Sequence, residues 1–316
     1  MSEFDISIAG EINLDLILYG LPEDMPVERE LIGDRFLATL GSSSAIVAHN
    51  AAAIGAKVIF ATAAGSDDFG RLALERLRQI GVDLAGVREH PGLQTGVTIL
   101  LPHGERRHIL TYPGTMETLR VEDLDFEQIR KARHFHLSSL YLQKGLHAGL
   151  PSLIQRLKGA GLTISLDTND DPADAWGWPL EELLFYVDCF LPSESEACRM
   201  TKRDNLEDAL DALPQEIPLV VVKRGSRGVR VREGQRRFDV APLTVIPVDT
   251  IGAGDSFDAG FLLAFLAGRD AGTCAMAGNI AGALSTQGQG GTESFRNQEF
   301  REAFLSKHHF YEIVKK

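Results

Sequence analysis

The chain has 316 residues, of which 44% are hydrophobic, so it can bury a sizeable core in one large α/β domain or in two domains. Its formal net charge of −12 argues against nucleic acid or an anionic membrane as a partner. The sequence shows no basic-then-apolar N-terminal signal, no apolar run as long as a transmembrane helix, and no metal-ligand spacing among its three cysteines. These features predict a cytoplasmic protein with reduced thiols.

The chain opens with two apolar stretches, residues 4–10 and 12–18, which read as a strand and its continuation. Side chains two positions apart in a strand face the same side, so Asn13 and Asp15 are predicted to share one face. A solvated edge strand is one interpretation of this pattern. A pocket that binds hydroxyl groups is the other.

A run of small residues follows, Gly41-Ser42-Ser43-Ser44, and it is predicted to open a helix over residues 45–54. A glycine and serine turn at a helix N-terminus can bind an anion or a hydroxyl group, and Ser44 as a plain N-cap is the alternative. A strand over residues 58–62 then leads to a turn in which Asp67 is predicted to cap a second helix.

Three segments outside the regular pattern are predicted to form a small separate sheet: residues 12–18, 28–39 and 93–112. The last of them contains two apolar stretches joined by a polar turn, which indicates a hairpin. Arg106, Arg107 and His108 lie on this hairpin. A solvated basic end of the hairpin is one interpretation of them, and a clamp for a substrate phosphate is the other.

From residue 121 onward, predicted helices and strands alternate. Helices are expected over residues 121–132, 145–159, 174–184 and 194–200, and strands over residues 135–138, 162–166, 187–191 and 219–222. Because several strands are wholly apolar, we expect a mostly parallel sheet covered by helices on both faces, with right-handed crossovers. Such sheets bind ligands at the carboxyl ends of their strands, where residues 167–169 and 192–196 supply polar side chains.

The turn Gly252-Ala253-Gly254 joins a predicted strand over residues 243–248 to a buried helix whose first turn carries Asp255. The uncovered amides and the helix dipole predict a site for an anion such as a phosphate. Asp255 as a simple helix cap is one interpretation. A base that contacts both a hydroxyl and a phosphoryl group is the other. No Walker loop occurs, so this turn is the best phosphate cradle in the chain.

Residues 249–262, Asp-Thr-Ile-Gly-Ala-Gly-Asp-Ser-Phe-Asp-Ala-Gly-Phe-Leu, resemble the second signature of the PfkB (ribokinase-like) carbohydrate kinases at every position. Residues 10–15 resemble the sugar-binding Gly-x-x-Asn-x-Asp of that family, and residues 65–70 its Gly-x-Asp-x-x-Gly element. The resemblance implies one ribokinase-like α/β domain over residues 1–316. In such a domain the small sheet is a lid over the sugar and often a homodimer surface.

The same resemblance implies that the protein transfers the γ-phosphate of ATP to a hydroxyl of a small sugar. Asp255 would be the base, and the amides of Gly252, Ala253 and Gly254 would form the anion hole. The other implied site residues are Asn13, Asp15, Gly41 and Ser42 for the substrate, Lys223, Gly225, Gly228 and Asn279 for the nucleotide, Glu196 for Mg²⁺ through water, and Asp249 with the Ile251 carbonyl for K⁺.

Three positions depart from the family pattern: Ser42 replaces a glycine, and Ile46 and Ser193 replace asparagines. Ser193 also predicts an N-cap with Glu196 as its capping-box partner. These departures leave open a non-catalytic, nucleotide-binding regulatory relative, and a nucleoside kinase of the same family remains an alternative to a sugar kinase. The scattered basic residues favour an unphosphorylated sugar as substrate.

Overall fold

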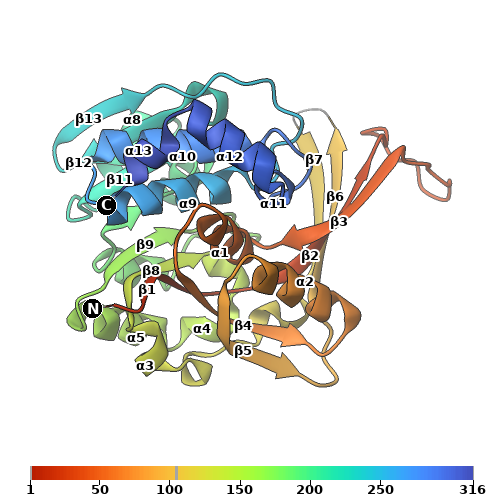
Figure 1. Cartoon of the computed structure of the whole chain (residues 1–316), viewed down its shortest axis with the longest axis horizontal. Helices are drawn as coiled ribbons and strands as arrows, with labels where there is room; N and C mark the ends of the chain where they lie inside the picture. Colours follow the sequence, from red (N-terminus) through yellow and green to blue (C-terminus); the bar gives the residue numbers. More distant parts are fainter. Residues whose placement is uncertain (1, 104–105, 316) are drawn as a thin grey trace.

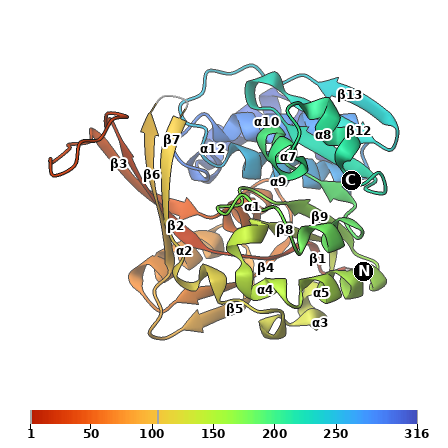
Figure 2. The ribbon, with the colours of Figure 1, turned by 180° about the vertical axis from the view of Figure 1, so that it is seen from behind.

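A nine-stranded sheet and a separate four-stranded sheet organise the computed structural model, which describes residues 2–103 and 106–315 (Figures 1 and 2). The large sheet has the order β13-β12-β11-β10-β9-β8-β1-β4-β5. Its strands are β1 (Phe4–Ala9), β4 (Val58–Gly65), β5 (Asp83–His90), β8 (Ala132–Ser138), β9 (Thr163–Asp167), β10 (Cys189–Phe190), β11 (Leu219–Lys223), β12 (Val229–Glu233) and β13 (Arg236–Val240). All neighbours from β5 to β11 are parallel, and β12 and β13 extend the sheet antiparallel, which confirms the predicted mostly parallel sheet.

Helices cover both faces of the large sheet, and each face has its own apolar core. One face carries α1 (Ser43–Ala53), α2 (Asp68–Gln79), α9 (Ala253–Leu266), α10 (Ala271–Ser285), α11 (Glu293–Arg296), α12 (Gln298–Lys307) and α13 (Phe310–Val314). The other carries α3 (Phe126–Ile129), α4 (Lys144–His147), α5 (Leu150–Gly159), α6 (Leu180–Leu184), α7 (Glu194–Thr201) and α8 (Leu206–Ala212). Fully burying one leucine or phenylalanine of these cores contributes roughly 1.5–3 kcal/mol. None of the described helices has the length and apolar character needed to cross a membrane.

The four-stranded sheet projects from the side of the large one (Figure 1). Its order is β3-β2-β6-β7, from β2 (Asn13–Tyr19), β3 (Arg35–Gly41), β6 (Gly96–His103) and β7 (Arg106–Tyr112). The strands lie in the three segments expected to form it, but residues 28–34 form no strand. The middle of the predicted hairpin turn, residues 104–105, lies outside the described residues.

Two predicted elements differ from the structure. The stretch over residues 243–248 is not a strand, although it is extended and β-branched. Pro242 and Pro247 lack the amide hydrogen that a sheet ladder needs. The helix predicted over residues 121–132 is broken into a 3₁₀ turn, Val121–Asp123, and the short helix α3, which Asp125 caps with its side chain.

Two further helices are shorter than predicted. The helix expected over residues 145–159 is split into α4 and α5, with Pro151 in the first turn of α5. Of residues 174–184, only Leu180–Leu184 are helical. Before them, the Asp171 carboxylate accepts the amides of Ala173, Ala175 and Trp176 at 2.8–2.9 Å, which builds a turn instead. Strand β5 and helix α8 have no predicted counterpart.

Candidate active site

The glycine-rich turn leads directly into α9, as the sequence predicts. Gly252 has a φ of 70°, and a Cβ on it would lie 2.5 Å from Cα of Gly291, so only glycine fits there. The first backbone amides of a helix lack acceptors within the helix. In α9, the Ala253 amide donates a long hydrogen bond of 3.3 Å to the Thr250 carbonyl oxygen. The start of α9 can therefore bind an anion.

Asp255 lies in the first turn of α9 and is 7% exposed. Burial raises the pKa of Asp255 to about 6, and the nearby Asp167 carboxylate is the second cause of this increase. Lys223 and hydrogen bonds from the side chains of Ser43 and Asn169 act in the opposite direction. The carboxylate is thus mostly ionised at neutral pH, yet it is a stronger base than an ordinary aspartate.

Asn13 and Asp15 lie on one face of β2, and Gly41 of the neighbouring strand β3 is paired with Asn13. A Cβ at position 41 would lie 2.1 Å from Asp15 Oδ1 and 2.3 Å from Asn13 Oδ1, so the glycine makes room for both side chains. The Asn13 amide group donates to Thr98 Oγ1 at 2.7 Å. Its oxygen is buried and has no hydrogen-bond partner among the described residues, so it can accept a bond from a ligand hydroxyl.

Asp15 and Asp255 are close enough for their charges to interact. Burial raises the pKa of Asp15 to about 7, and the charges of Asp255 and Asp249 raise it as well, whereas Arg107 lowers it. Two carboxylates from β2 and α9 therefore share one site between the small sheet and the start of α9.

The predicted anion site at the start of α1 is already occupied by a protein carboxylate. Ser42 is the N-cap by position, but its hydroxyl donates to the Glu11 carbonyl oxygen at 2.6 Å. Ser44 is not the cap, because it lies inside the helix and donates to Glu11 Oε2 at 2.7 Å. Burial raises the pKa of Glu11. No pattern in the sequence indicates that Glu11 folds back onto this helix.

Lys223 lies directly beneath the turn that precedes Asp255. Its Nζ donates to Asp167 Oδ2 at 2.5 Å and to the Asp258 oxygens at 3.3 and 3.4 Å. A Cβ on Gly254 would lie 3.6 Å from the same nitrogen. Burial opposes the charge of Lys223, but the carboxylates of Asp167 and Asp258 raise its pKa above the ordinary value. The ammonium group is therefore held in place by acidic partners, close to the helix start.

Glu196 and Ser193 form the capping box that the sequence predicts at the start of α7. The Glu196 carboxylate accepts the Ser193 amide at 2.8 Å, and Ser193 Oγ accepts the Glu196 amide at 3.3 Å. Burial and the Asp167 charge raise the pKa of Glu196 to about 7. The Glu196 carboxylate thus caps a helix and also interacts electrostatically with the charges of Asp167 and Lys223.

The other predicted nucleotide residues have structural partners of their own. Gly225 and Gly228 have φ values of 57° and 79° in the tight turn between β11 and β12. A Cβ on Gly228 would lie 2.2 Å from the Val240 carbonyl oxygen, so this turn requires glycine. The Asn279 side chain donates to the Ala241 carbonyl at 2.7 Å and ties α10 to the following segment.

Asp249 links the small sheet to the glycine-rich turn. Its carboxylate accepts the Tyr19 hydroxyl at 2.7 Å and the amides of Ile251 and Gly290, both at 3.0 Å. Within residues 2–103 and 106–315, no group of three or more His, Cys, Asp or Glu side chains is placed to hold a metal ion.

Ile46 fills the place where the family pattern has an asparagine, and its side chain packs beside Gly252 and Gly291. One turn later, the Asn50 amide donates to Ser256 Oγ and to the Gly291 carbonyl, both at 2.9 Å. Asn50 therefore connects α1 to α9 and to the loop at Gly291. No sequence motif singled it out.

Asn169 and Asp258 also reach the site without a predicted role. Asn169 has a φ of 50°, accepts the Ser139 amide at 2.8 Å and bonds to Asp255. It lies in the polar stretch after β9 that the sequence marks as a ligand-binding edge. For Asp258 a signal existed, since residues three apart on a helix share a face and Asp255 is the catalytic candidate.

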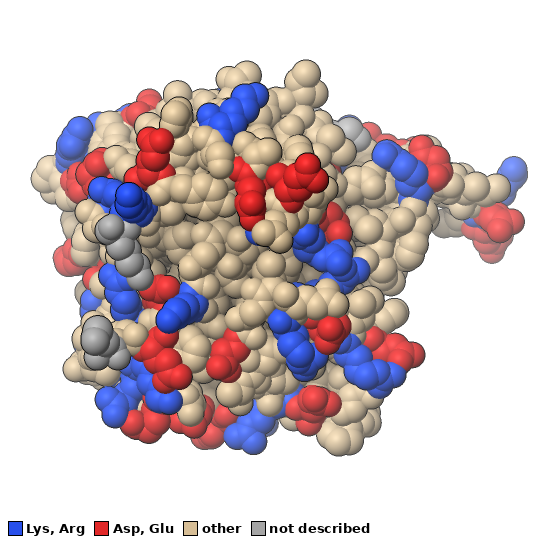
Figure 3. Space-filling view, in the orientation of Figure 1, with Lys and Arg blue, Asp and Glu red and all other residues tan. Residues whose placement is uncertain are grey.

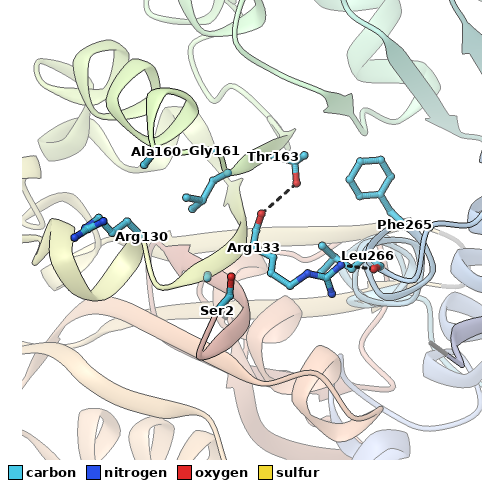
Figure 4. Close-up of a pocket in the computed structure, with 11 residues that line it drawn as sticks. Ser2, Arg130, Arg133, Ala160, Gly161, Thr163, Phe265 and Leu266 are labelled. Carbon is cyan, nitrogen blue, oxygen red and sulfur yellow. Dashed lines mark hydrogen bonds between the residues drawn. The ribbon is translucent and has the colours of Figure 1, made fainter.

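A cavity of about 480 Å³ opens at the opposite end of the large sheet (Figure 4). Its lining includes Thr163, at the amino end of β9, and Leu266, at the C-terminal end of α9. Arg133, which also lines it, donates to the Leu266 carbonyl at 2.6 Å. The cavity is thus separated from Asp255 by the length of α9, and its main cation is already bonded within the protein.

Residues 4–298 match the family described as pfkB family carbohydrate kinase. An ATP-dependent ribose-1-phosphate kinase from Halopiger xanaduensis is 32% identical over 304 residues, or 95% of this chain and 97% of that protein. A cytidine kinase from Thermococcus kodakarensis is 28% identical over 280 residues, or 87% of this chain and 93% of that protein. Among solved structures, a candidate ribokinase II from E. coli in complex with ATP and Mg²⁺ is 23% identical with a TM-score of 0.82, over 96% of this chain and all of the other, 100%.

Proposed function

The chain belongs to the pfkB family of carbohydrate kinases, which are phosphotransferases, and we propose that it transfers the γ-phosphate of ATP to a hydroxyl group of a small sugar with Asp255 as the base. One observation carries this proposal. The buried Asp255 carboxylate, with a pKa raised to about 6, lies in the first turn of an anion-binding helix and interacts with the substrate candidate Asp15.

In the proposed reaction, the Asp15 carboxylate and Asn13 Oδ1 accept hydrogen bonds from sugar hydroxyls and orient the acceptor. Asp255 takes the proton of the attacking hydroxyl group while the oxygen of that hydroxyl group bonds to the γ-phosphorus. The bond from that phosphorus to the β–γ bridging oxygen breaks, and ADP leaves. The proton stays on Asp255 until the products depart.

The amides of Gly252, Ala253 and Gly254 would stabilise the charge that spreads over the transferred phosphoryl oxygens. Lys223, 3.6 Å from a Cβ position on Gly254, supports this role because its ammonium group adds positive charge beneath the same turn. We assign Gly225, Gly228 and Asn279 to the wall of the nucleotide site, where they hold the backbone around it. A base or a donor of this kind typically contributes on the order of 10²–10⁴ in rate.

Mg²⁺ would be held mainly by the ATP phosphates and by water, with Glu196 as an outer partner. Its carboxylate accepts the Ser193 amide and still has acceptor capacity for a metal-bound water. The ion would neutralise phosphate charge.

Asp249 accepts three protein donors, which leaves room for one K⁺ contact beside the Ile251 carbonyl. A rate that is insensitive to potassium would remove the K⁺ site.

We propose that residues 1–316 form one kinase domain, in which the four-stranded sheet is the lid and excludes water from the reaction. The outward face of this sheet exposes the apolar residues Ile99, Leu110 and Tyr112, which are 41%, 53% and 52% accessible. A homodimer through this face would cover them. On the face of the molecule shown in Figure 3, basic and acidic side chains are interspersed, which supports a small-molecule substrate rather than nucleic acid.

An assay of ADP release across pentoses, hexoses, sugar acids, sugar phosphates and nucleosides tests the function. The ribose-1-phosphate kinase and cytidine kinase relatives make sugar phosphates and nucleosides the first acceptors to compare. Turnover of nucleosides alone would favour the nucleoside kinase. An absence of ADP release with every acceptor would favour the non-catalytic relative.

A further inference from the structure

Strand β7 presents Arg107 to the same side of the small sheet as Asp15. The register pairs Asp15 with Thr98 on β6 and Thr98 with Thr111 on β7. Paired residues share a face, and so do residues two or four apart on one strand. The 3.1 Å contact between the hydroxyls of Thr98 and Thr111 confirms this alignment. Arg107, four residues before Thr111, therefore faces the site.

The guanidinium of Arg107 bridges the small sheet and the start of α9. Its Nη1 donates to Thr250 Oγ1 at 3.3 Å, and Thr250 lies just before the glycine-rich turn. Its charge is also felt by Asp15, whose pKa it lowers. Arg107 is thus placed over the sugar side of the site, between Asp15 and the turn that would hold the transferred phosphoryl group.

Arg107 has spare capacity to bind an anion. Among the described residues, no carboxylate lies within ion-pair distance of it, and the Thr250 hydroxyl uses one of its five N–H donors. Arg106 behaves differently, because it points to the opposite face and pairs with Glu23 at 2.7 Å. Two adjacent arginines of one strand therefore have different surroundings, and only Arg107 faces the site with its charge uncompensated.

We propose that Arg107 binds an anionic group, a phosphate or a carboxylate, on the acceptor, so that the preferred substrate is a sugar phosphate or a sugar acid. The planar guanidinium matches either group through paired hydrogen bonds. The carboxylates of Asp15, Asp249 and Asp255 would repel an anionic acceptor. Such an acceptor could bind here only if a cation offset this repulsion, and Arg107 is placed to do so. This inference rests on the proposed kinase function and names its substrate class.

The test compares matched acceptors, a pentose against its 1-phosphate and 5-phosphate and a hexose against its sugar acid, in the wild type and in Arg107→Ala, Arg107→Lys and Arg106→Ala. For the preferred anionic acceptor, we expect Arg107→Ala to lower kcat/KM by about 10- to 100-fold, mostly through KM. Arg107→Lys should recover part of the loss, since it keeps the charge without the fork. The kcat/KM for neutral acceptors should fall much less than that for the anionic acceptor, the KM for ATP should stay within a few-fold of the wild type, and Arg106→Ala should match the wild type.

Two results would overturn the inference. One is a wild type that prefers each neutral acceptor to its anionic counterpart. The other is an equal loss on neutral and anionic acceptors in Arg107→Ala, which would make Arg107 a latch between the small sheet and Thr250. Failure of the proposed function looks different, because then no acceptor supports ADP release even in the wild type. Comparing the sugar phosphates with the sugar acid shows whether the anionic group of the preferred acceptor is a phosphate or a carboxylate.

Discussion

The charge on Asp255 raises the pKa of Asp15, although Asp15 belongs to the small sheet and Asp255 to the first turn of α9. The roles proposed for these two carboxylates, substrate orientation for Asp15 and proton transfer for Asp255, would therefore be coupled electrostatically. A hydroxyl group that bonds to both carboxylates would bring them into one functional unit.

Replacing Asp255 with asparagine keeps the size of the side chain but removes the base. We expect kcat to fall by about 10²–10⁴-fold, while the Kd for ATP stays within a few-fold of the wild type. Steady-state kinetics and calorimetric titration with ATP measure the two effects. Asp68→Asn is the matched control, because Asp68 also lies in the first turn of a helix but is exposed and forms a surface ion pair with Arg71. Near-normal turnover in Asp255→Asn would exclude the proposed mechanism.

The activity should fall on the acidic side of neutrality. Asp255 and Asp15 have pKa values raised to about 6 and about 7. Asp255 must be ionised to take the proton of the acceptor hydroxyl, and an ionised Asp15 accepts stronger hydrogen bonds from the acceptor than a protonated one. As the pH drops through 7 and then 6, each carboxylate gains a proton, so kcat/KM should decline over this range. A profile of kcat/KM from pH 5 to pH 9 measures it. A profile that stays flat down to pH 5 would contradict the role of both groups.

The same pKa shift predicts that Asp15 destabilises the ligand-free protein at neutral pH. A carboxyl group whose folded pKa is raised from 3.8 to about 7 binds a proton more tightly when folded, so its contribution to stability is lost as the pH rises through that interval. Asp15→Asn should therefore have a higher Tm than the wild type at pH 8, and the difference should shrink towards pH 5. Thermal unfolding at several pH values measures the difference, and an equal Tm at pH 8 would refute it.

Lys223 should be more important for stability than an ordinary surface lysine. Removing it with Lys223→Met leaves the buried Asp167 and Asp258 without their cation, which typically costs about 3–5 kcal/mol. Adding Asp258→Asn to this variant should restore part of the loss, because one buried carboxylate disappears. Urea unfolding measures the free energies. Lys158→Met is the control, since its ion pair with Asp188 is more exposed and should cost less.

The local elements follow from contiguous residues, and many of them were predictable. Alternating apolar strands and helices indicated the large sheet, and the hydroxyls and carboxylates of the capping residues marked helix starts such as Asp67 and Ser193. Predictions were wrong where turn chemistry competed with periodicity. Asp125 and Asp171 bind nearby amides and end a regular pattern that apolar spacing alone would continue.

Candidate residues for the site were predictable where one motif holds them together, and they were missed where the contact spans the chain. Asp255 and the turn before it were recognisable from their own stretch of sequence. Glu11 and Asn50 were not, because each meets its partner only when separate strands and helices assemble. The favoured unphosphorylated sugar was inferred from scattered basic residues, and sequence position alone could not show which of them faces the site.

The sequence by itself determined the family and the glycine-rich helix start, because Gly252 must adopt a positive φ and α9 must follow it at once. Only the tertiary structure decided which charges meet there. Strand register puts Arg107 and Asp15 on one face, and the order of strands in the sheet brings Lys223 beside Asp167. Register and strand order depend on packing between distant segments, so no local pattern contains them. Contiguous residues determine the conformation of the glycine-rich turn, whereas the tertiary fold determines which charged side chains surround it.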